Sequence, residues 1–397
     1  MKKFGIGILG DSKIVKLLAE QIQHREDQGD PVHFVALAAS SDKADMFNHL
    51  NMALEADEII ESDTVDIVVV CTEGVMNAYD QARKALEFGK HVVTNNMTML
   101  AAHGEKLWRL AEDKNVHLRF EACAMGSVPV FENIFTHFKG QDIQRLYGTL
   151  NATCNFALMR MKDKGEKLTD ALSDAIELGY AEKDPNVDIS GKDSLFKMAL
   201  LHTSAFGEWL NVGQKPSDSL EGLEPVDIQL CQKLAMNIKL LAQSNEHDIS
   251  VAPTLFEEYT QMGNTTGTLT GLVIESTESG PIFFCGHAAD YDSIASAMLS
   301  DSMKIAFGHK PWKITKQKPT ASREKMGAYY IRVMEPDSDK ILNANHLHVL
   351  ESQNMEIQGQ NYIAYIVETG MPKNELSNFL KHGHLSHSYY LMNVFKD

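Results

Sequence analysis

Four ionisable side chains in the middle of the chain have types that can pair with a cation or move a proton. Glu182 and Asp188 are carboxylates, and Asp193 stands four residues before Lys197. A spacing of four puts two side chains on one helix face, where a carboxylate and an amine can pair. A buried ammonium group needs such carboxylates, and a lysine can take a proton from an alcohol. The Asp193–Lys197 spacing alone is also typical of an ordinary ion pair on a helix surface.

A second place for chemistry is the turn Gly10–Val15, which follows a short apolar run and precedes a helical pattern. A dinucleotide site has the pattern G-x-G-x-x-G there, because its glycines let backbone approach the pyrophosphate. Here only Gly10 remains, since Ser12 and Val15 occupy the other two positions and Asp11 adds a negative charge. Two interpretations stay open: a modified dinucleotide site, or an ordinary turn between strand and helix.

The segment after the second apolar run bears on which dinucleotide would bind. Ser40, Ser41 and Lys43 stand there, and no carboxylate directly ends the run to take the ribose hydroxyls. Hydroxyl and amine groups suit a 2′-phosphate better, so the sequence favours NADP over NAD.

The middle of the chain resembles the homoserine dehydrogenase family in four successive blocks. The family patterns are V-T-A-N-K, E-A-S-V-x-x-G-I-P, L-N-G-T-[ST]-N and G-Y-A-E-x-D-P, the last extended by D-x-x-G-x-D-x-x-x-K. The matching segments are Val93–Met97, Glu121–Pro129, Leu150–Asn155 and Leu178–Pro185, the last continuing through Asp188, Gly191 and Asp193 to Lys197. The last block is the most specific, and weaker likeness extends over nearly the whole chain.

The resemblance implies an NAD(P)-dependent oxidoreductase that interconverts homoserine and aspartate 4-semialdehyde by hydride transfer, in threonine and methionine biosynthesis. It assigns catalysis to Lys197 and Asp193. It assigns the amino-acid substrate to Thr153, Tyr180, Glu182 and Asp188. The cofactor residues expected from the glycine turn and the following strand ends are Gly10, Ser12, Lys13, Ile14, Ser40, Ser41, Lys43, Thr72 and Asn96.

The resemblance also implies a monovalent cation, Na⁺ or K⁺, bound by main-chain carbonyl groups. The matching residues are Glu121, Ala124, Gly126 and Val128. Carbonyl ligands tolerate changes of side chain, so such a site could persist here. A simple turn is the alternative.

Met97 is the main departure from the family pattern. It stands where the family has the lysine of V-T-A-N-K, which assists proton transfer beside the cofactor. A thioether can neither donate nor accept a proton usefully. Together with the altered glycine turn, Met97 leaves a second hypothesis open: a catalytically impaired homologue that binds an amino acid as a sensor or an assembly subunit.

The elements that must position these residues alternate first between apolar strands and amphipathic helices, as in a Rossmann-like, doubly wound parallel sheet. We predict three domains: a nucleotide-binding domain at 1–130, an α+β substrate and dimerisation domain at 131–322, and an ACT-like regulatory module at 323–397. Residues 291–322 could return to the first domain. The last module has the βαββαβ order of a ferredoxin-like fold, and we expect the rest to fold without it.

Within the later domains the sequence predicts a strand at Gln144–Thr153 and helices at Leu168–Leu178, Ser194–Phe206 and Ile228–Ala242. In the last module it predicts helical stretches near Asn343–Glu351 and Asn374–Leu380.

Composition bears on the partners, the state of the cysteines and the location of the protein. The net charge of −17 disfavours nucleic acid and anionic membrane as partners. The five cysteines form no C-x-x-C pair, so reduced thiols are expected rather than a disulfide framework or a zinc site. We read no signal peptide and no apolar run long enough to span a bilayer, and therefore expect a cytoplasmic protein, a homodimer as in the family, acting on a small molecule.

Overall fold

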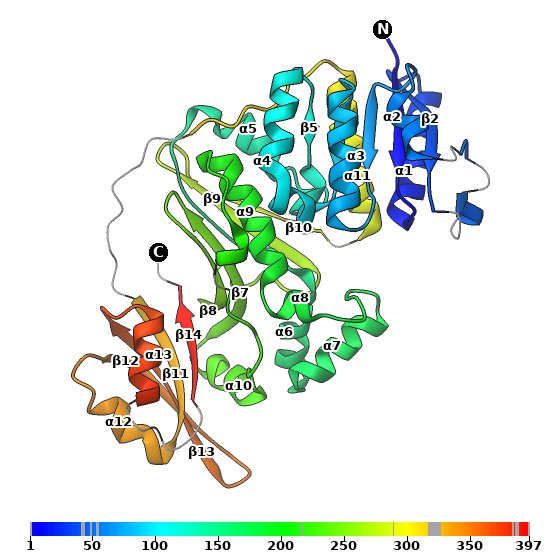
Figure 1. The fold of residues 1–397 in the computed structure, drawn as a ribbon. Helices are drawn as coiled ribbons and strands as arrows, with labels where there is room; N and C mark the ends of the chain where they lie inside the picture. The colour runs from blue at the N-terminus through cyan, green and yellow to red at the C-terminus, as the bar shows by residue number, and fades with distance from the viewer. Residues whose placement is uncertain are drawn as a thin grey trace.

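The computed structural model describes residues 2–40, 44–47, 50–52, 55–215, 217–288, 290–316, 327–382, 385 and 389–395. Figure 1 shows an N-terminal α/β part (blue to cyan), a central part (green) and a C-terminal part (orange to red) that follow one another through the molecule. Two of the predicted cofactor residues, Ser41 and Lys43, lie outside the described residues. So does most of the segment between the second and third parts.

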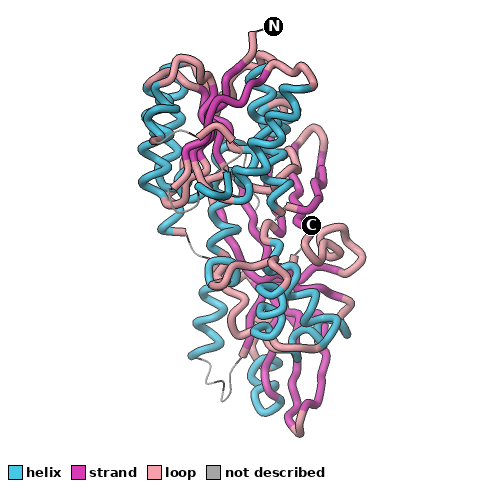
Figure 2. Tube along the Cα trace, turned by 90° about the vertical axis from the view of Figure 1, so that its right-hand side faces the viewer, coloured by secondary structure: helices cyan, strands magenta, loops and turns pink. Residues whose placement is uncertain are grey.

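The N-terminal part is built on one five-stranded sheet in which every pairing is parallel, in the order β2-β1-β3-β4-β5. The apolar runs form its strands because almost every strand residue is buried. Figure 2 shows helices on both sides of this sheet. The elements are β1 (Phe4–Leu9), α1 (Lys13–Asp27), β2 (Val32–Ala38), α2 (Ala56–Glu61), β3 (Ile67–Val70), α3 (Val75–Glu87), β4 (His91–Thr94), α4 (Met97–Lys114) and β5 (Leu118–Arg119). This is the doubly wound, Rossmann-like sheet predicted from the sequence.

One later helix covers this sheet. Helix α11 (Tyr291–Ala306) packs along α1 and against β4. Its buried Met298 and Ile305 belong to the same apolar cluster as Ile6 and Ile8 of β1. The chain therefore comes back to the N-terminal sheet after it has built the central part.

The central part has helices packed on an antiparallel run of strands ordered β10-β9-β6-β7-β8. Its strands are β6 (Ile143–Thr149), β7 (Met236–Asn245), β8 (Ile249–Glu257), β9 (Leu269–Ser276) and β10 (Gly280–His287). Its helices are α5 (Val130–Phe135), α6 (Ala152–Lys164), α7 (Leu168–Glu177), α8 (Asn186–Ile189), α9 (Lys192–Phe206) and α10 (Pro225–Lys233). Helix α9 also packs against α4, which joins the central part to the N-terminal one.

The C-terminal part has the predicted βαββαβ order but shares the central sheet. Its elements are β11 (Gly327–Met334), α12 (Ser338–Leu342), β12 (His348–Ile357), β13 (Gln360–Thr369), α13 (Lys373–His382) and β14 (Tyr390–Val394). Strand β14 pairs with β11 on one side and, in parallel, with β8 on the other. One nine-stranded sheet thus runs through both parts.

Three predicted elements are wrong. Residues 228–242 are not one helix, because α10 ends at Lys233, Ala235 takes a left-handed backbone (φ 53°), and β7 follows. The strand expected through Thr153 ends at Thr149, and Asn151 begins α6 by accepting a hydrogen bond from the Cys154 amide. The stretch 343–351 is not helical, since α12 ends at Leu342 and β12 begins at His348.

Two further observations concern the described residues as a whole. No helix among them is both long and apolar enough to cross a bilayer. All five cysteines are free thiols, four of them buried.

Candidate active site

A cluster of two carboxylates, one amide and one amine lies where α6 and α9 begin. The amide nitrogen of Asn151 donates to Asp188 Oδ1 at 2.7 Å and to Asp193 Oδ2 at 2.8 Å. Lys197 Nζ donates to the same Asp193 oxygen at 2.8 Å and to the Leu150 carbonyl at 3.0 Å. The Lys197 and Asp193 side chains are 20% and 16% exposed, so this pair is not the fully solvated ion pair that the spacing alone allowed.

Asp188 carries the charge in this cluster that lacks a cationic partner among the described residues. Burial raises the pKa of Asp188, the hydrogen bond from Asn151 lowers it, and the neighbouring Asp193 and Glu182 charges raise it further while Lys197 lowers it. An incoming ammonium group would offset that mutual repulsion.

The three remaining predicted substrate residues lie around the same place. Thr153, in the first turn of α6, donates its hydroxyl to the Tyr180 carbonyl at 2.9 Å. The Tyr180 ring is 42% exposed and its centroid lies 5.1 Å from that of Phe156. Glu182 is exposed and makes no hydrogen bond to another described residue. Its charge nevertheless acts on Asp188, so Glu182 lies within electrostatic reach of the cluster.

The end of β4 approaches this cluster through a buried cysteine. The Cys123 thiol lies 3.6 Å from the Thr94 carbonyl, the last residue of β4. Burial raises the pKa of Cys123 well above its usual value, and the nearby Lys197 charge acts in the opposite direction. Met97 follows three residues after Thr94 as the first residue of α4, half-buried against the main apolar core. Met97 thus follows the strand whose end contacts Cys123, the thiol on which the Lys197 charge acts.

The glycine turn keeps part of a phosphate-binding geometry. Gly10 has φ 140°, and a Cβ there would lie 3.0 Å from the Cys71 carbonyl group, so only glycine fits. Ser12 begins α1 without using its hydroxyl as a cap. Asp11 accepts a hydrogen bond from Ser40, a residue expected to face the cofactor.

The other two predicted cofactor residues of α1 differ in their exposure to solvent. Ile14 is 9% exposed and belongs to the apolar core. Lys13 is exposed, with Nζ 5.7 Å from the Tyr291 ring centroid at the start of α11.

Thr72 and Asn96 are tied to each other across two strand ends. The Asn96 amide donates to the carbonyls of Thr72 at 2.9 Å and Gly74 at 3.2 Å, and its oxygen accepts from the Met99 amide. The Thr72 hydroxyl donates to Gln81 at 2.6 Å. Asn96 therefore holds the loop after β3 against the start of α4, and the Thr72 side chain holds it against α3.

The predicted cation-binding segment is a tight turn over a buried charge network. The Glu121 carboxylate accepts from the amides of Phe131 and Glu132 at the start of α5. Its own amide donates to Asp301, which Arg119 also contacts. Burial first, and the Asp301 charge second, raise the pKa of Glu121 to about 8. Since its carboxylate is already engaged, Glu121 could contribute to a cation only through its carbonyl.

The rest of that turn is shaped by backbone. Gly126 has φ 53°, and a Cβ there would lie 2.1 Å from the Ser293 hydroxyl. Val128 donates its amide to Met125 and accepts from Val130, which reverses the chain into α5. Ala124 is buried.

Asn151 belongs to the candidate site by its hydrogen bonds, and the sequence interpretation missed it. Its block was recognised, but Asn151 was not assigned a role, because its two acceptors lie 37 and 42 residues further along the chain. The available signal was an asparagine directly before a helix, which is a common capping residue.

Comparison with known proteins points to one family over both of the larger parts. A family model described as "Homoserine dehydrogenase, NAD binding domain" matches residues 5–121, and one described as "Homoserine dehydrogenase" matches residues 129–303.

Individual proteins agree with the family models. A homoserine dehydrogenase of Lactococcus lactis is 31% identical over 300 residues, which cover 72% of this chain and 70% of that protein. One of Neisseria gonorrhoeae is 29% identical over 363 residues, covering 85% and 83%. The solved structure of a homoserine dehydrogenase from Thiobacillus denitrificans aligns over 100% of this chain and 99% of that one with a TM-score of 0.88. At 24% identity, that last likeness concerns the fold.

Proposed function

The chain belongs to the homoserine dehydrogenase family of nicotinamide-dependent oxidoreductases, and on that premise we propose that Lys197 and Asp193 carry the reaction and Asp188 binds the substrate. The observation that supports the proposal most strongly is the hydrogen-bonded series Asp188–Asn151–Asp193–Lys197. In it, one carboxylate has no cationic partner among the described residues and the other orients an amine.

The substrate would bind by its charged amino group. We propose that Asp188 and Glu182 receive the ammonium of homoserine, because a buried charge must be paired. Thr153 and the half-exposed Tyr180 would hydrogen-bond the rest of the molecule. The 2.9 Å bond from Thr153 to the Tyr180 carbonyl keeps these two residues together.

Lys197 would take the proton of the substrate hydroxyl as its alcohol carbon is oxidised. Two contacts, to Asp193 and to the Leu150 carbonyl, orient its amine. A bound nicotinamide supplies the hydride acceptor. General-base help of this kind contributes typically 10²–10⁴-fold to a rate.

The residues of the glycine turn fit a dinucleotide at the level of backbone. Gly10 allows close approach, the unused Ser12 hydroxyl can donate, and the N-terminus of α1 favours phosphate. We propose NADP over NAD because no carboxylate follows β2 directly, and Ser40 stands two residues after its end. Asp11 opposes this preference by placing a negative charge beside Ser40.

The other family expectations remain part of the proposal. They are a Na⁺ or K⁺ ion held by carbonyls of Glu121, Ala124, Gly126 and Val128, a homodimer through the central part, and an ACT-like regulatory role for residues 323–397. The turn geometry of Gly126 and the βαββαβ order support the first and third of these.

Two measurements test the proposal. Homoserine-dependent reduction of NADP⁺ should be detectable in the purified protein and absent in Lys197→Ala. Homoserine binding without any turnover would instead favour an amino-acid sensor. Dissociation constants for NADPH and NADH, read from fluorescence quenching, test the nucleotide preference. Asp11→Asn should tighten NADPH severalfold more than NADH, and tighter binding of NADH by the unaltered protein would contradict it.

A further inference from the structure

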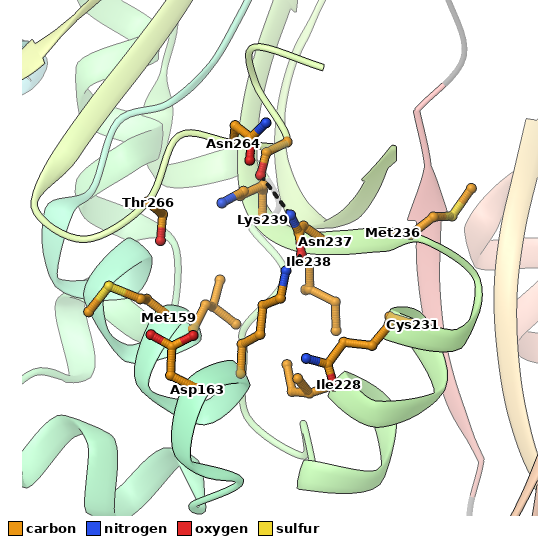
Figure 3. A pocket seen from close by; sticks show the side chains of 14 residues that line it. Met159, Asp163, Ile228, Cys231, Met236, Asn237, Ile238, Lys239, Asn264 and Thr266 are labelled. Atoms are coloured by element: carbon orange, nitrogen blue, oxygen red, sulfur yellow. Dashed lines mark hydrogen bonds between the residues drawn. The ribbon is translucent and has the colours of Figure 1, made fainter. Parts of the chain in front are cut away.

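A cavity of about 200 Å³ lies between the C-terminal half of α6, α10 and β7. Figure 3 shows its lining, with Asp163 of α6 on one side and Lys239 of β7 on the other. Its walls also include Cys231 of α10 and Asn237 of β7. No residue assigned to homoserine or to the cofactor lines this cavity.

Lys239 is the unusual member of that lining. The residue is 4% exposed, and its amine donates to the Thr265 carbonyl. No carboxylate among the described residues lies within 4.0 Å of it, so the charge of a buried ammonium is uncompensated there. Burial, and secondarily the charge of Lys162, lower the pKa of Lys239 to about 8.

A second amine adds to the positive character of the cavity. Lys162 Nζ donates to Asn237 Oδ1 at 2.8 Å, while its nearest carboxylate oxygen, on the exposed Glu258, lies 3.9 Å away. The Asn237 amide in turn donates to the Gly263 carbonyl at 3.0 Å. The hydrogen bond of Lys162 therefore goes to a neutral side chain, and its nearest carboxylate lies beyond hydrogen-bonding distance.

We propose that this cavity binds a small organic carboxylate, which accepts hydrogen bonds from the amine of Lys239 and is attracted by Lys162. An ammonium has three donors, and Lys239 uses one on Thr265, which leaves two for an anion in the cavity. Lys239 is the buried ammonium of this lining, while Asp163 in the lining and Glu258 beyond Lys162 already carry negative charge. A singly charged carboxylate therefore fits better than a doubly charged phosphate, which would leave an excess of negative charge. The proposal does not depend on the reaction assigned to the active site.

The position of the cavity would let its occupant influence two other regions. Helix α6 carries Thr153 in its first turn and Lys162 near its end, about 14 Å apart at the rise of an α-helix. Helix α10 lines the cavity with Cys231 and contacts the C-terminal part through Asp227. A carboxylate here would thus rest on the helix that shapes the active site and on the helix that anchors the last module.

Thermal unfolding with sodium acetate as the probe tests the proposal. At pH 7, acetate should raise the Tm of the unaltered protein, compared with sodium chloride at equal ionic strength, because a ligand that binds only the folded state stabilises it. In Lys239→Met the acetate dissociation constant should rise at least tenfold. Lys164→Met is the matched control, because Lys164 lies on the same helix, is half exposed and does not line the cavity. Its dissociation constant should stay within twofold.

The pH dependence of acetate affinity gives a second test of the proposal, which needs no variant. The titratable groups facing Lys239 are Lys162 and Asp163 of α6 and Cys231 of α10, with Glu258 beyond Lys162. Burial raises the pKa of Cys231 well above its usual value, so that thiol stays neutral. Acetate affinity should therefore fall as pH rises above about 8, where Lys239 loses its proton.

Three results would overturn the proposal. The first is an acetate effect no larger than that of chloride, which would mean that water alone satisfies Lys239. The second is an effect of acetate that is equal in Lys239→Met and the unaltered protein, or, if that variant does not fold, equal at pH 7 and pH 9.5. The third is stronger stabilisation by inorganic phosphate than by acetate, which would contradict the choice of a carboxylate. None of these results depends on catalytic activity.

Discussion

The Asn151 amide nitrogen lies 2.7 Å from Asp188, so one neutral side chain fixes the position of the proposed ammonium-binding carboxylate. The same nitrogen holds Asp193, which orients Lys197. Because the amide donates one hydrogen to each carboxylate, it fixes the proposed substrate-binding group and the group that orients Lys197 relative to each other.

Asn151→Ser should therefore lower kcat/KM for homoserine by roughly 10–100-fold, since small displacements of reacting groups cost that much. Serine keeps an oxygen that can cap α6 but cannot bridge two carboxylates. Steady-state kinetics and thermal unfolding, measured together, separate the two roles. Asn361→Ser is the control, because Asn361 donates to Glu335 in the C-terminal part. Unchanged kcat/KM with a lower Tm would reduce Asn151 to a helix cap.

Met97→Lys should increase turnover by up to ~10²-fold and move the rising limb of the pH–rate profile to lower pH. A second amine near Lys197 disfavours double protonation, so more of the neutral, proton-accepting form is present at a given pH. The measurement is kcat against pH for homoserine oxidation. Lys197→Ala should abolish activity with either residue at position 97. An unchanged profile with intact NADPH binding would place position 97 away from the reacting centre.

Arg332→Met should lower the free energy of unfolding by about 3–5 kcal/mol, because it leaves a buried carboxylate without its partner. Arg332 Nε lies 2.8 Å from Asp227, which is fully buried, and Tyr330 contacts the same oxygen at 3.0 Å. Urea unfolding measures the loss, and adding Asp227→Asn should recover part of it.

The control for this ion pair is Lys373→Met. Lys373 bridges the same two parts to Asp218 at 2.7 Å, but both side chains are partly exposed, so less than about 1 kcal/mol should be lost. Equal losses in the two variants would contradict the distinction. The buried pair also argues against our expectation that the rest of the chain folds without the last module.

His117 should make the protein less stable in acid. Burial first, then the charges of His91 and Arg119, lower the pKa of His117 to about 3, from 6.5 in an unfolded chain. The stability that the neutral His117 contributes is therefore fully present above pH 6.5 and is lost as pH falls toward 3. The loss reaches roughly 2–3 kcal/mol at pH 4.5. In His117→Gln the loss of unfolding free energy between pH 7.5 and 4.5 should shrink by that amount. His346→Gln, at an exposed histidine, is the control, and equal slopes in all three proteins would refute the assignment.

Strands made of one continuous apolar run could be predicted closely from the sequence. The runs at Phe4–Leu9 and His91–Thr94 form strands with those bounds, because continuous apolar residues suit a sheet covered on both faces. Residues 228–242 misled the prediction because their apolar residues fit both a helical and a strand period. Lys239 falls within that predicted helix, whereas β7 buries it beside a cavity.

In the candidate site, contacts between residues close in sequence could likewise be predicted, and contacts between residues far apart in sequence could not. The Asp193–Lys197 contact is local, and its spacing indicated it directly. The bridge from Asn151 depends on how α6, α8 and α9 pack, which no spacing in the sequence encodes. The engagement of Ser40 by Asp11 likewise depends on two strand ends that lie side by side in the fold.

The position of β14 also sets an order of events during synthesis. This strand lies between β8 and β11 in the sheet, yet β9, α11 and all the rest of the C-terminal part precede it along the chain. A ribosome therefore releases β8 with an open edge, and the pairing of β14 with Thr254 and Leu255 can form only after residues 390–394 have emerged. Until then the nascent chain presents an unpaired strand, the kind of surface that chaperones recognise and that other chains can pair with.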